Sequence, residues 1–389
     1  MYHNSTMDNL VVLIMAGGSG ERFWPLSTSA KPKQLLRLID SERSLIKMTV
    51  DRILPLTSAE RIFIGSNAIQ AKAVIEELPE LPEKNILIEP AFRDTAAAIG
   101  FGAVVIEKMF PGSTMIVLAS DHIIRCEEEF RNDVMAAVEC AQNENSIVTL
   151  GIKPSKPETG YGYLQVEHTD AEQESAKQKS GKLTDAEQTV GKQAKVSEER
   201  NSQTDKLPLK VLRFCEKPSL DKAVEYVNSG NYLWNSGMFI FKIAVIMEAF
   251  KNLLPDHYRL FKEIEKIEDI TNEAGIEKLT AIFSQFTKIS IDFGIMEKFQ
   301  NIKVVPSDFG WSDIGSYTAL PEFFRLNENS SVIKGVTVNE IDSHGNIIIS
   351  TTGKKISLLG IEDSIIVDTP DNILICSKKE AQNIKKLLK

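Results

Sequence analysis

The sequence predicts an α/β protein whose sheet is mixed but mainly parallel, followed by a smaller β-domain. Short apolar runs rich in Val and Ile, which suit fully buried strands, occur at residues 10–15, 61–65, 85–88 and 114–120. Helical segments of about ten residues separate these runs, as in βαβ units, whose ligands bind at the carboxyl ends of the strands. From residue 331 onward, short strands separated by Gly, Asn and Asp indicate a second domain. We therefore expect domains over residues 1–325 and 326–389, and a ligand site among the residues that follow the strands of the first.

The amino-acid composition of the chain limits the kinds of partner that it is expected to bind. The chain has 389 residues, of which 42% are hydrophobic and 25% are charged, as in ordinary globular proteins. Its 54 acidic residues outnumber its 45 basic residues, and the net charge of −9 argues against nucleic acid as a partner. Its four cysteines show neither CxxC spacing nor a dense pattern, which favours a reducing compartment. No apolar run reaches the roughly eighteen residues that span a bilayer, so we expect a cytoplasmic protein without a membrane partner.

A glycine-rich turn follows the first predicted strand. Gly17, Gly18 and Gly20 carry no Cβ, so successive backbone N–H groups can converge on an anion. Arg22 and Lys33 follow on the same loop, and together with the glycines they describe a polyphosphate site. The alternative is a plain strand–turn–helix connection with incidental surface cations, which the presence of both Arg22 and Lys33 disfavours.

The spacing excludes two familiar phosphate loops. A Walker A loop requires GxxxxGK[ST], whereas the lysines here lie well beyond the glycines, and a dinucleotide fold requires a third glycine that this turn lacks. The remaining pattern, GGSGERFWPLS followed by PKQ, resembles the sugar-nucleotide pyrophosphorylases, and most of all the mannose-1-phosphate guanylyltransferases. The resemblance implies a Rossmann-like, GT-A-like nucleotidyltransferase fold with a small left-handed β-helix domain at the C-terminus. It also implies nucleotide binding by Gly17, Gly18, Gly20 and Gln34.

The segment after the third predicted strand contains a residue that could recognise the base of a nucleotide. Guanine presents N1–H and its exocyclic amine side by side, and a carboxylate such as Glu89 accepts such a pair with two oxygens. Adenine and the pyrimidines lack this pair, so the carboxylate would discriminate against them. The alternative for Glu89 is a cap of the helix that begins near Thr95. We expect Arg93 to line the nucleotide pocket, and Asp94 either to line it or to pair with Arg93; the resembled family usually has Asn in place of Asp94.

Two aspartates that are far apart in the sequence are the candidate metal ligands. Asp121 ends the fourth predicted strand, where a carboxylate suits Mg²⁺, an ion that takes one or two carboxylates and adds phosphate oxygens and water. Taken alone, such an aspartate is more often a turn or cap residue. Asp313 lies on a loop constrained by glycines and Trp311, and Asp308 is the nearby alternative. In the resembled family, the aspartates at the positions of Asp121 and Asp313 hold the metal together, whereas His122 is expected to pack or to form a hydrogen bond.

The sugar-phosphate pocket is expected in the middle of the chain. Gly162 would let the backbone approach a sugar closely, although a hairpin turn is a competing explanation. Glu216 and Lys217 fall on opposite faces of a strand unless the backbone bends, which the following proline makes plausible. The resemblance assigns Glu216 to hexose hydroxyls and Lys217 to the sugar phosphate. Gly162 and Asn235 would contact the hexose, and Asp292 lies in a family block without an assigned role.

Further expectations concern the rest of the chain. Residues 167–206 contain no aromatic residue and few apolar ones, so we expect an exposed, mobile insertion without a catalytic role. Residues 256–286 are expected to be helical throughout. The resembled family commonly uses its β-helix domain for subunit contacts, so we expect a homo-oligomer, namely a dimer.

Together these expectations describe attack by mannose 1-phosphate on the α-phosphorus of GTP, with Mg²⁺ as cofactor and with GDP-mannose and diphosphate as products. Arg22 and the glycine amides would hold the β- and γ-phosphates, and Lys33 would stabilise charge at the α-phosphorus. The alternatives are another sugar-1-phosphate nucleotidyltransferase with a different hexose or base, a glycosyltransferase of related architecture, and a non-catalytic regulatory paralogue. Glycosyltransferases usually hold their metal with Asp-x-Asp, which residues 121–123 do not provide, and silent paralogues usually lose the loop cations or a metal carboxylate.

Overall fold

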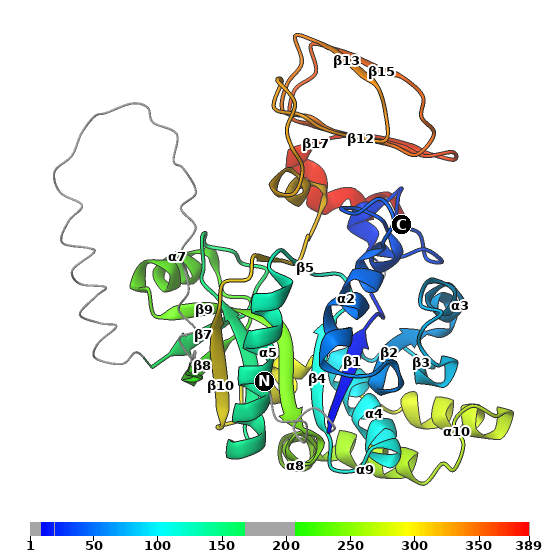
Figure 1. Ribbon diagram of the computed structural model, residues 1–389, viewed down its shortest axis with the longest axis vertical. Helices are drawn as coiled ribbons and strands as arrows, with labels where there is room; N and C mark the ends of the chain where they lie inside the picture. The colour runs from blue at the N-terminus through cyan, green and yellow to red at the C-terminus, as the bar shows by residue number, and fades with distance from the viewer. Residues whose placement is uncertain (1–8, 19, 168–206, 389) are drawn as a thin grey trace.

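The computed structural model describes residues 9–18, 20–167 and 207–388. Ser19 of the glycine-rich turn, and all of the predicted insertion at 167–206 except its first residue, lie outside the described residues. The described chain forms a large α/β domain with a small β-domain beside it (Figure 1), as the sequence predicts.

A nine-stranded mixed sheet forms the large domain, in the order β3-β2-β1-β4-β9-β6-β10-β8-β7. Its first four strands are mutually parallel: β1 (Leu10–Met15), β2 (Ile62–Asn67), β3 (Ile86–Glu89) and β4 (Thr114–Ala119). β9 (Tyr232–Lys242) runs antiparallel to β4 and to β6 (Ile147–Ile152). β10 (Ile302–Ser307) is parallel to β6, and β8 (Leu209–Cys215) and β7 (Tyr163–Val166) add an antiparallel edge. The sheet is therefore mixed, with its parallel half at the N-terminal end of the chain.

Helices cover both faces of this sheet, because strands such as β1 are apolar on both sides. One layer contains α4 (Asp94–Met109), α8 (Ile243–Leu253), α9 (Pro255–Glu265) and α10 (Glu273–Phe283), whose phenylalanines share one core. The other layer contains α2 (Leu45–Ile53), α3 (Ala68–Glu77) and α5 (Glu127–Glu144). A further helix, α7 (Leu220–Ser229), packs near β9.

The prediction of continuous helix over residues 256–286 is wrong, because α9 and α10 are separate helices. Asp269 forms a turn between them, with its Oδ1 accepting from Thr271 N over 2.8 Å. Asn272 then caps α10 by accepting from Gly275 N over 2.8 Å. Asp and Asn side chains compete with the helix for backbone donors in this way, so they interrupt an apolar pattern that alone suggests one helix.

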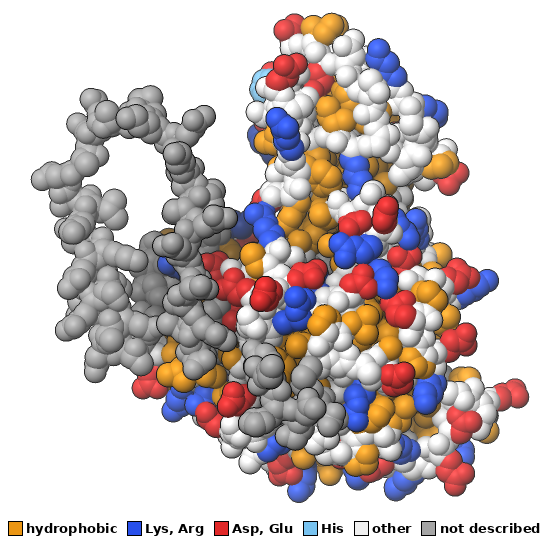
Figure 2. All heavy atoms as spheres, viewed as in Figure 1, with side chains coloured by type: hydrophobic (Ala, Val, Ile, Leu, Met, Phe, Trp, Pro, Cys, Tyr) orange, Lys and Arg blue, Asp and Glu red, His pale blue; other side chains and the backbone are white. Residues whose placement is uncertain are grey.

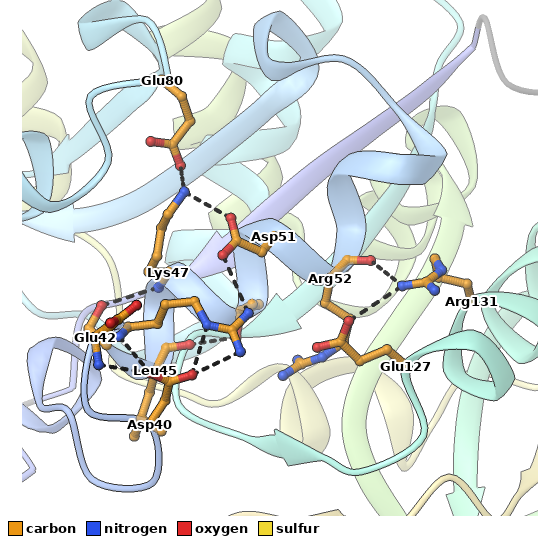
Figure 3. A network of polar contacts seen from close by, with 12 residues as sticks. Asp40, Glu42, Leu45, Lys47, Asp51, Arg52, Glu80, Glu127 and Arg131 are labelled. Atoms are coloured by element: carbon orange, nitrogen blue, oxygen red, sulfur yellow. Dashed lines mark hydrogen bonds and ion pairs between the residues drawn. The ribbon is translucent and has the colours of Figure 1, made fainter.

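A polar network fixes α2, the helix that follows the glycine-rich turn and its lysines (Figure 3). Lys47 Nζ lies 2.8 Å from Asp51 Oδ1 on the same helix and 2.8 Å from Glu80 Oε1, beyond α3. On another side of α2, Arg131 from α5 donates to Arg52 O over 3.4 Å. These contacts hold α2 against its neighbours, so they also fix the position of the C-terminal end of the loop that precedes α2.

The second domain consists of short stacked strands. β12 (Val332–Lys334), β14 (Ile347–Ser350) and β16 (Ser364–Asp368) are parallel neighbours, and β17 (Ile373–Ser377) completes the sheet antiparallel to β16. β13 (Val338–Ile341) and β15 (Ile356–Leu359) form a second parallel layer, and Ile348, Leu358 and Ile366 share a small apolar core in this domain. The 3₁₀ segment η7 (Tyr317–Glu322) precedes this domain, on the other side of the predicted boundary at residue 325.

The chain ends in a 3₁₀ segment that returns to the large domain. This segment, η8 (Lys378–Leu388), is red in Figure 1 and lies beside the blue N-terminal part of the chain. Its neighbour there is η1 (Glu21–Phe23), which contains Arg22. The first and last parts of the sequence therefore meet beside the glycine-rich turn.

The surface carries charges of both signs. Acidic and basic side chains are interspersed over the face shown in Figure 2. Within the described ranges, no helix is long and apolar enough to cross a bilayer.

Candidate active site

The glycine-rich turn follows β1 and packs directly against Lys33. The turn starts from the carboxyl edge of the parallel strands, where Ala16 N donates to Gly65 O over 2.7 Å. Gly20 has a φ of +62°, and a Cβ on this residue would lie 2.4 Å from Lys33 Cβ. Residue 20 must therefore be glycine for two reasons, its left-handed backbone and its contact with Lys33.

Gln34 holds the turn in shape. Its Nε2 donates to Ala16 O over 2.7 Å and to Gly18 O over 3.3 Å, and it also lies 3.2 Å from Gln70 Oε1. The side chain of Gln34 is buried. In this structure the side-chain amide N–H groups of Gln34 donate to the backbone of the turn. A direct hydrogen bond from Gln34 to a nucleotide stays a prediction.

Lys33 joins the two predicted metal ligands. Its Nζ lies 2.8 Å from Asp121 Oδ2, and it donates to the backbone O of Asp313 over 2.5 Å. The two aspartates come together because the short strands β5 (Ile123–Ile124) and β11 (Trp311–Ser312) pair antiparallel, directly after Asp121 and directly before Asp313. The structure therefore assembles Lys33, Asp121 and Asp313 at one place from three distant parts of the chain.

The loop that carries Asp313 is strained. Ile314 has a φ of +38°, a left-handed conformation that is a genuine outlier for a β-branched residue. Such strain persists only where the surroundings enforce it, and it is found mainly at functional sites. The carboxylate itself is held by Tyr161, whose hydroxyl donates to Asp313 Oδ1 over 2.6 Å. Burial and the Asp313 carboxylate raise the pKa of Tyr161, so its hydroxyl remains a donor.

His122 supports the same region through Trp311. Trp311 Nε1 donates to His122 Nδ1 over 3.2 Å, and the two rings meet edge to face. Burial lowers the pKa of His122, so we infer a neutral ring. Asp308, the alternative to Asp313, is exposed.

The donor set around Lys33 fits a magnesium ion bound together with a substrate. In the described parts of the chain, no group of three or more His, Cys, Asp or Glu side chains could hold a metal on its own. Mg²⁺ is commonly held by only one or two carboxylates, with substrate phosphates and water as further ligands. Asp121 and Asp313 supply two carboxylates beside a turn suited to phosphates. Burial acts to raise the pKa of Asp121, but the charge of Lys33 and the hydrogen bonds to the carboxylate are among the causes that together keep it below its usual value.

Arg22 lies in the neighbourhood of Asp313. A Cβ on Gly315 would stand 3.5 Å from Arg22 Nη1 and 3.5 Å from Asp313 Oδ2, so the guanidinium and the carboxylate both lie close to residue 315. Arg22 Nη1 also donates to Gln382 Oε1 over 3.0 Å. Both predicted loop cations thus border the same site as the two aspartates.

Glu89 ends β3 in a buried position beside the turn. Its Oε1 lies 3.7 Å from a Cβ built on Gly17 and 3.8 Å from one built on Gly65, and the residue is 8% exposed. Burial raises the pKa of Glu89 to about 7. The alternative role as a helix cap is wrong, because α4 begins at Asp94 with Arg93 as its N-cap residue.

Arg93 and Asp94 are arranged differently from the expectation. Arg93 donates from Nε to Phe283 O over 3.0 Å and from Nη2 to Ser284 O over 2.8 Å, so its guanidinium binds the end of α10. Asp94 accepts from Thr95 N and has a φ of +68°, a conformation that Asn tolerates well. The backbone therefore offers a reason for the Asn that the resembled family usually has here. Nucleotide binding by Arg93 stays a prediction.

Gly162 and Glu216 lie in direct contact in the lining of the predicted sugar pocket. A Cβ on Gly162 would lie 2.5 Å from Glu216 Oε2, so a larger residue would displace the carboxylate. The backbone bends at Lys217, which has a φ of +44°. The bend brings Lys217 Nζ to 2.5 Å from Glu216 Oε1, so the two side chains form an ion pair instead of pointing to opposite faces.

Asn235 and Asp292 lie next to this pair. Asn235 Oδ1 accepts from Thr149 Oγ1 over 2.9 Å, and its Nδ2 lies 3.3 Å from Asp292 Oδ1. Burial and the nearby Glu216 carboxylate raise the pKa of Asp292 to about 7. The family block around Asp292 gave this residue no role, and only the folded chain shows that its carboxyl faces Asn235.

The sugar pocket and the site of Asp313 belong to one cleft of about 170 Å³. Its lining includes Gly162, Glu216, Asn235, Asp292 and Asp313, together with Tyr161. The resemblance implies that residues 159–163 as a stretch contact the hexose, but it does not single out Tyr161, whose place between Gly160 and Gly162 is a signal of a special turn. A sugar phosphate in this cleft would have hydroxyl-binding groups at one end and Asp313 at the other.

Residues 11–181 and 196–330 match the family model described as nucleotidyl transferase, and residues 337–389 match one described as a MannoseP isomerase/GMP-like beta-helix domain. The chain belongs to the nucleotidyl transferase family. Two curated relatives of this nucleotidyltransferase, the mannose-1-phosphate guanylyltransferases of Klebsiella pneumoniae and Salmonella montevideo, are 33% and 34% identical over 97% of the chain. The chain covers 73% and 72% of their respective lengths.

The fold of this nucleotidyltransferase also has a solved counterpart. A crystal structure from Thermus thermophilus, described as a mannose-1-phosphate geranyltransferase, matches with a TM-score of 0.79 and 27% identity over 98% of both chains. The predicted nucleotidyltransferase fold with a C-terminal β-helix domain is confirmed, and so is the predicted relationship to mannose-1-phosphate guanylyltransferases.

Proposed function

We propose that this nucleotidyltransferase transfers GMP from GTP to mannose 1-phosphate, giving GDP-mannose and diphosphate. The observation that carries the proposal is the meeting of Lys33, Asp121 and Asp313 beside the glycine-rich turn, at the end of a cleft suited to a sugar. The relatives named above as mannose-1-phosphate guanylyltransferases support the choice of substrates.

The reaction needs positioning and charge neutralisation more than covalent chemistry. A phosphate oxygen of mannose 1-phosphate attacks the α-phosphorus of GTP, the new P–O bond forms, and the bond to the β-phosphate oxygen breaks to release diphosphate. Arg22 and the amides of the turn would hold the β- and γ-phosphates, and Lys33 would stabilise negative charge at the α-phosphorus. Asp121 and Asp313 would hold Mg²⁺, which when bound neutralises phosphate charge.

Polar side chains in two places would select the base and the sugar. Glu89 in its ionised form would accept both donors of guanine, and its burial makes an unpaired base costly. Glu216 and Asn235 would bind hexose hydroxyls, and Lys217 would bind the sugar phosphate. We further propose that the protein acts in the cytoplasm, consistent with its four free cysteines, and that it forms a dimer.

A diphosphate-release assay with GTP, MgCl₂ and mannose 1-phosphate tests the proposal. We expect release that depends on all three components and a product with the mass of GDP-mannose. Equal turnover with another base or another hexose 1-phosphate would assign a different nucleotidyltransferase specificity. GDP-mannose consumption without diphosphate would indicate a glycosyltransferase, and binding without turnover a regulatory paralogue.

A further inference from the structure

The last segment of the chain packs against the loop that carries Arg22. Ala381 and Ile384 of η8 are buried in one apolar cluster with Phe23 and Tyr317. Tyr317 reinforces this contact, because its hydroxyl donates to Phe23 O over 2.8 Å and its ring lies 4.9 Å from the ring of Phe23. Since Phe23 directly follows Arg22, the docking of η8 fixes the backbone from which the guanidinium extends.

Gln382 lies between the two buried residues of η8, and its Oε1 accepts from Arg22 Nη1 over 3.0 Å. Both side chains are exposed, so Arg22 would otherwise sample many rotamers. A guanidinium has five N–H donors, and one bond to Gln382 leaves the others for a phosphate. The amide is neutral, so it orients the cation without cancelling the charge that attracts an anion.

A free Arg22 would have an alternative partner close by. The guanidinium and the Asp313 carboxylate both lie near Gly315, since Arg22 Nη1 and Asp313 Oδ2 are each 3.5 Å from the position of a Cβ on that residue. An ion pair between them would occupy both a phosphate-binding cation and a predicted magnesium ligand.

We propose that Gln382 is a positioning residue, through which the C-terminal domain orients Arg22 toward the polyphosphate. This inference rests on the proposed function, because it assigns a regulator to the same phosphate site. It makes the β-helix domain part of the nucleotide site: the site is complete only when η8 is docked on the loop.

The test is a set of matched variants. Gln382→Met keeps the length of the side chain and removes its acceptor, whereas Gln382→Glu keeps an acceptor but adds a charge that pairs with Arg22. Asn383→Met is the control, since Asn383 is also an amide on η8 but donates to Glu380 Oε2 over 2.7 Å within the segment. Calorimetry with inorganic diphosphate and Mg²⁺ measures the phosphate site directly, without turnover.

We expect Gln382→Met to weaken diphosphate binding about three- to tenfold, as the loss of one hydrogen bond would. The KM for GTP should rise by a similar factor, while the KM for mannose 1-phosphate and the melting temperature stay unchanged. Gln382→Glu should also weaken diphosphate binding, and Asn383→Met should bind as tightly as the wild type. Unchanged diphosphate affinity in both Gln382 variants would overturn the inference.

A double-mutant cycle tests whether Gln382 acts through Arg22. In an Arg22→Ala background, Gln382→Met should cause no further loss of diphosphate affinity. If the two losses add, Gln382 acts independently of Arg22 and the inference is wrong. Failure of the wild type to release diphosphate from GTP would contradict the proposed function instead, so the two failures are distinguishable.

Discussion

The contact between Gly20 and Lys33 makes Gly20→Ala an informative substitution. A Cβ at residue 20 would lie 2.4 Å from Lys33 Cβ and 2.7 Å from Lys33 N, whereas ordinary contacts begin near 3.4 Å. Lys33 would have to move by about 1 Å, because the overlap involves its Cβ and backbone and not the flexible end of its side chain. A misplacement of about 1 Å in a positioning group costs on the order of a hundredfold in rate.

We therefore expect kcat to fall about a hundredfold in Gly20→Ala, which corresponds to about 2.7 kcal/mol of lost transition-state stabilisation. The left-handed φ of +62° adds a stability cost of about 1–2 kcal/mol for alanine. Gly112→Ala separates the two effects: Gly112 also has a positive φ, +74°, but nothing lies within 4 Å of its Cβ position. That control should lose stability and retain kcat.

Initial rates of diphosphate release and thermal melts of both variants check this reasoning. A Gly20→Ala enzyme with kcat within threefold of the wild type would show that Lys33 need not stay where the structure has it. The same conclusion would follow if Gly20→Ala and Gly112→Ala lost activity equally.

Further predictions concern the catalytic cation and metal ligand, the base-binding carboxylate and one buried arginine. Lys33→Ala and Asp121→Ala should each lower kcat far more than they raise KM for either substrate; an effect on KM alone, in steady-state assays, would refute their roles. Protonation of Glu89, whose pKa is raised to about 7, removes one of its two acceptors, so the kcat/KM preference for GTP over ATP should shrink as pH falls from 8 to 6. Glu89→Gln should lose at least tenfold of this preference at pH 8, and an unchanged ratio would assign base reading elsewhere. Arg52 is buried, its Nε and Nη2 have no hydrogen-bond partner, and burial lowers its pKa to about 10. Arg52→Met should therefore raise the free energy of unfolding, measured in urea, by about 1–3 kcal/mol. A loss of stability would contradict this prediction.

Local patterns predicted the strands and helices around the site well. The apolar runs at residues 10–15 and 114–120 became β1 and β4, since a stretch that is apolar on both sides must be buried between two layers. The helix over residues 256–286 was wrong, because the cap at Asn272 is a side-chain hydrogen bond that periodicity does not reveal. The pairing of Glu216 with Lys217 likewise required a left-handed residue that alternation along a strand does not predict.

By itself, the sequence determined which chemical groups are present and on which segments: a glycine turn with two cations, a carboxylate after a strand, and a second carboxylate on a Gly-Trp loop. Such features are local, because backbone conformation and burial depend on neighbouring residues. Only the tertiary structure decided that Lys33 lies between Asp121 and Asp313, that Tyr161 holds Asp313, and that Gln382 reaches Arg22. Those contacts join residues up to 360 positions apart. Their geometry is set by the pairing of β5 with β11 and by the packing of η8 on the large domain. Neither the pairing nor the packing can be read from a local sequence pattern.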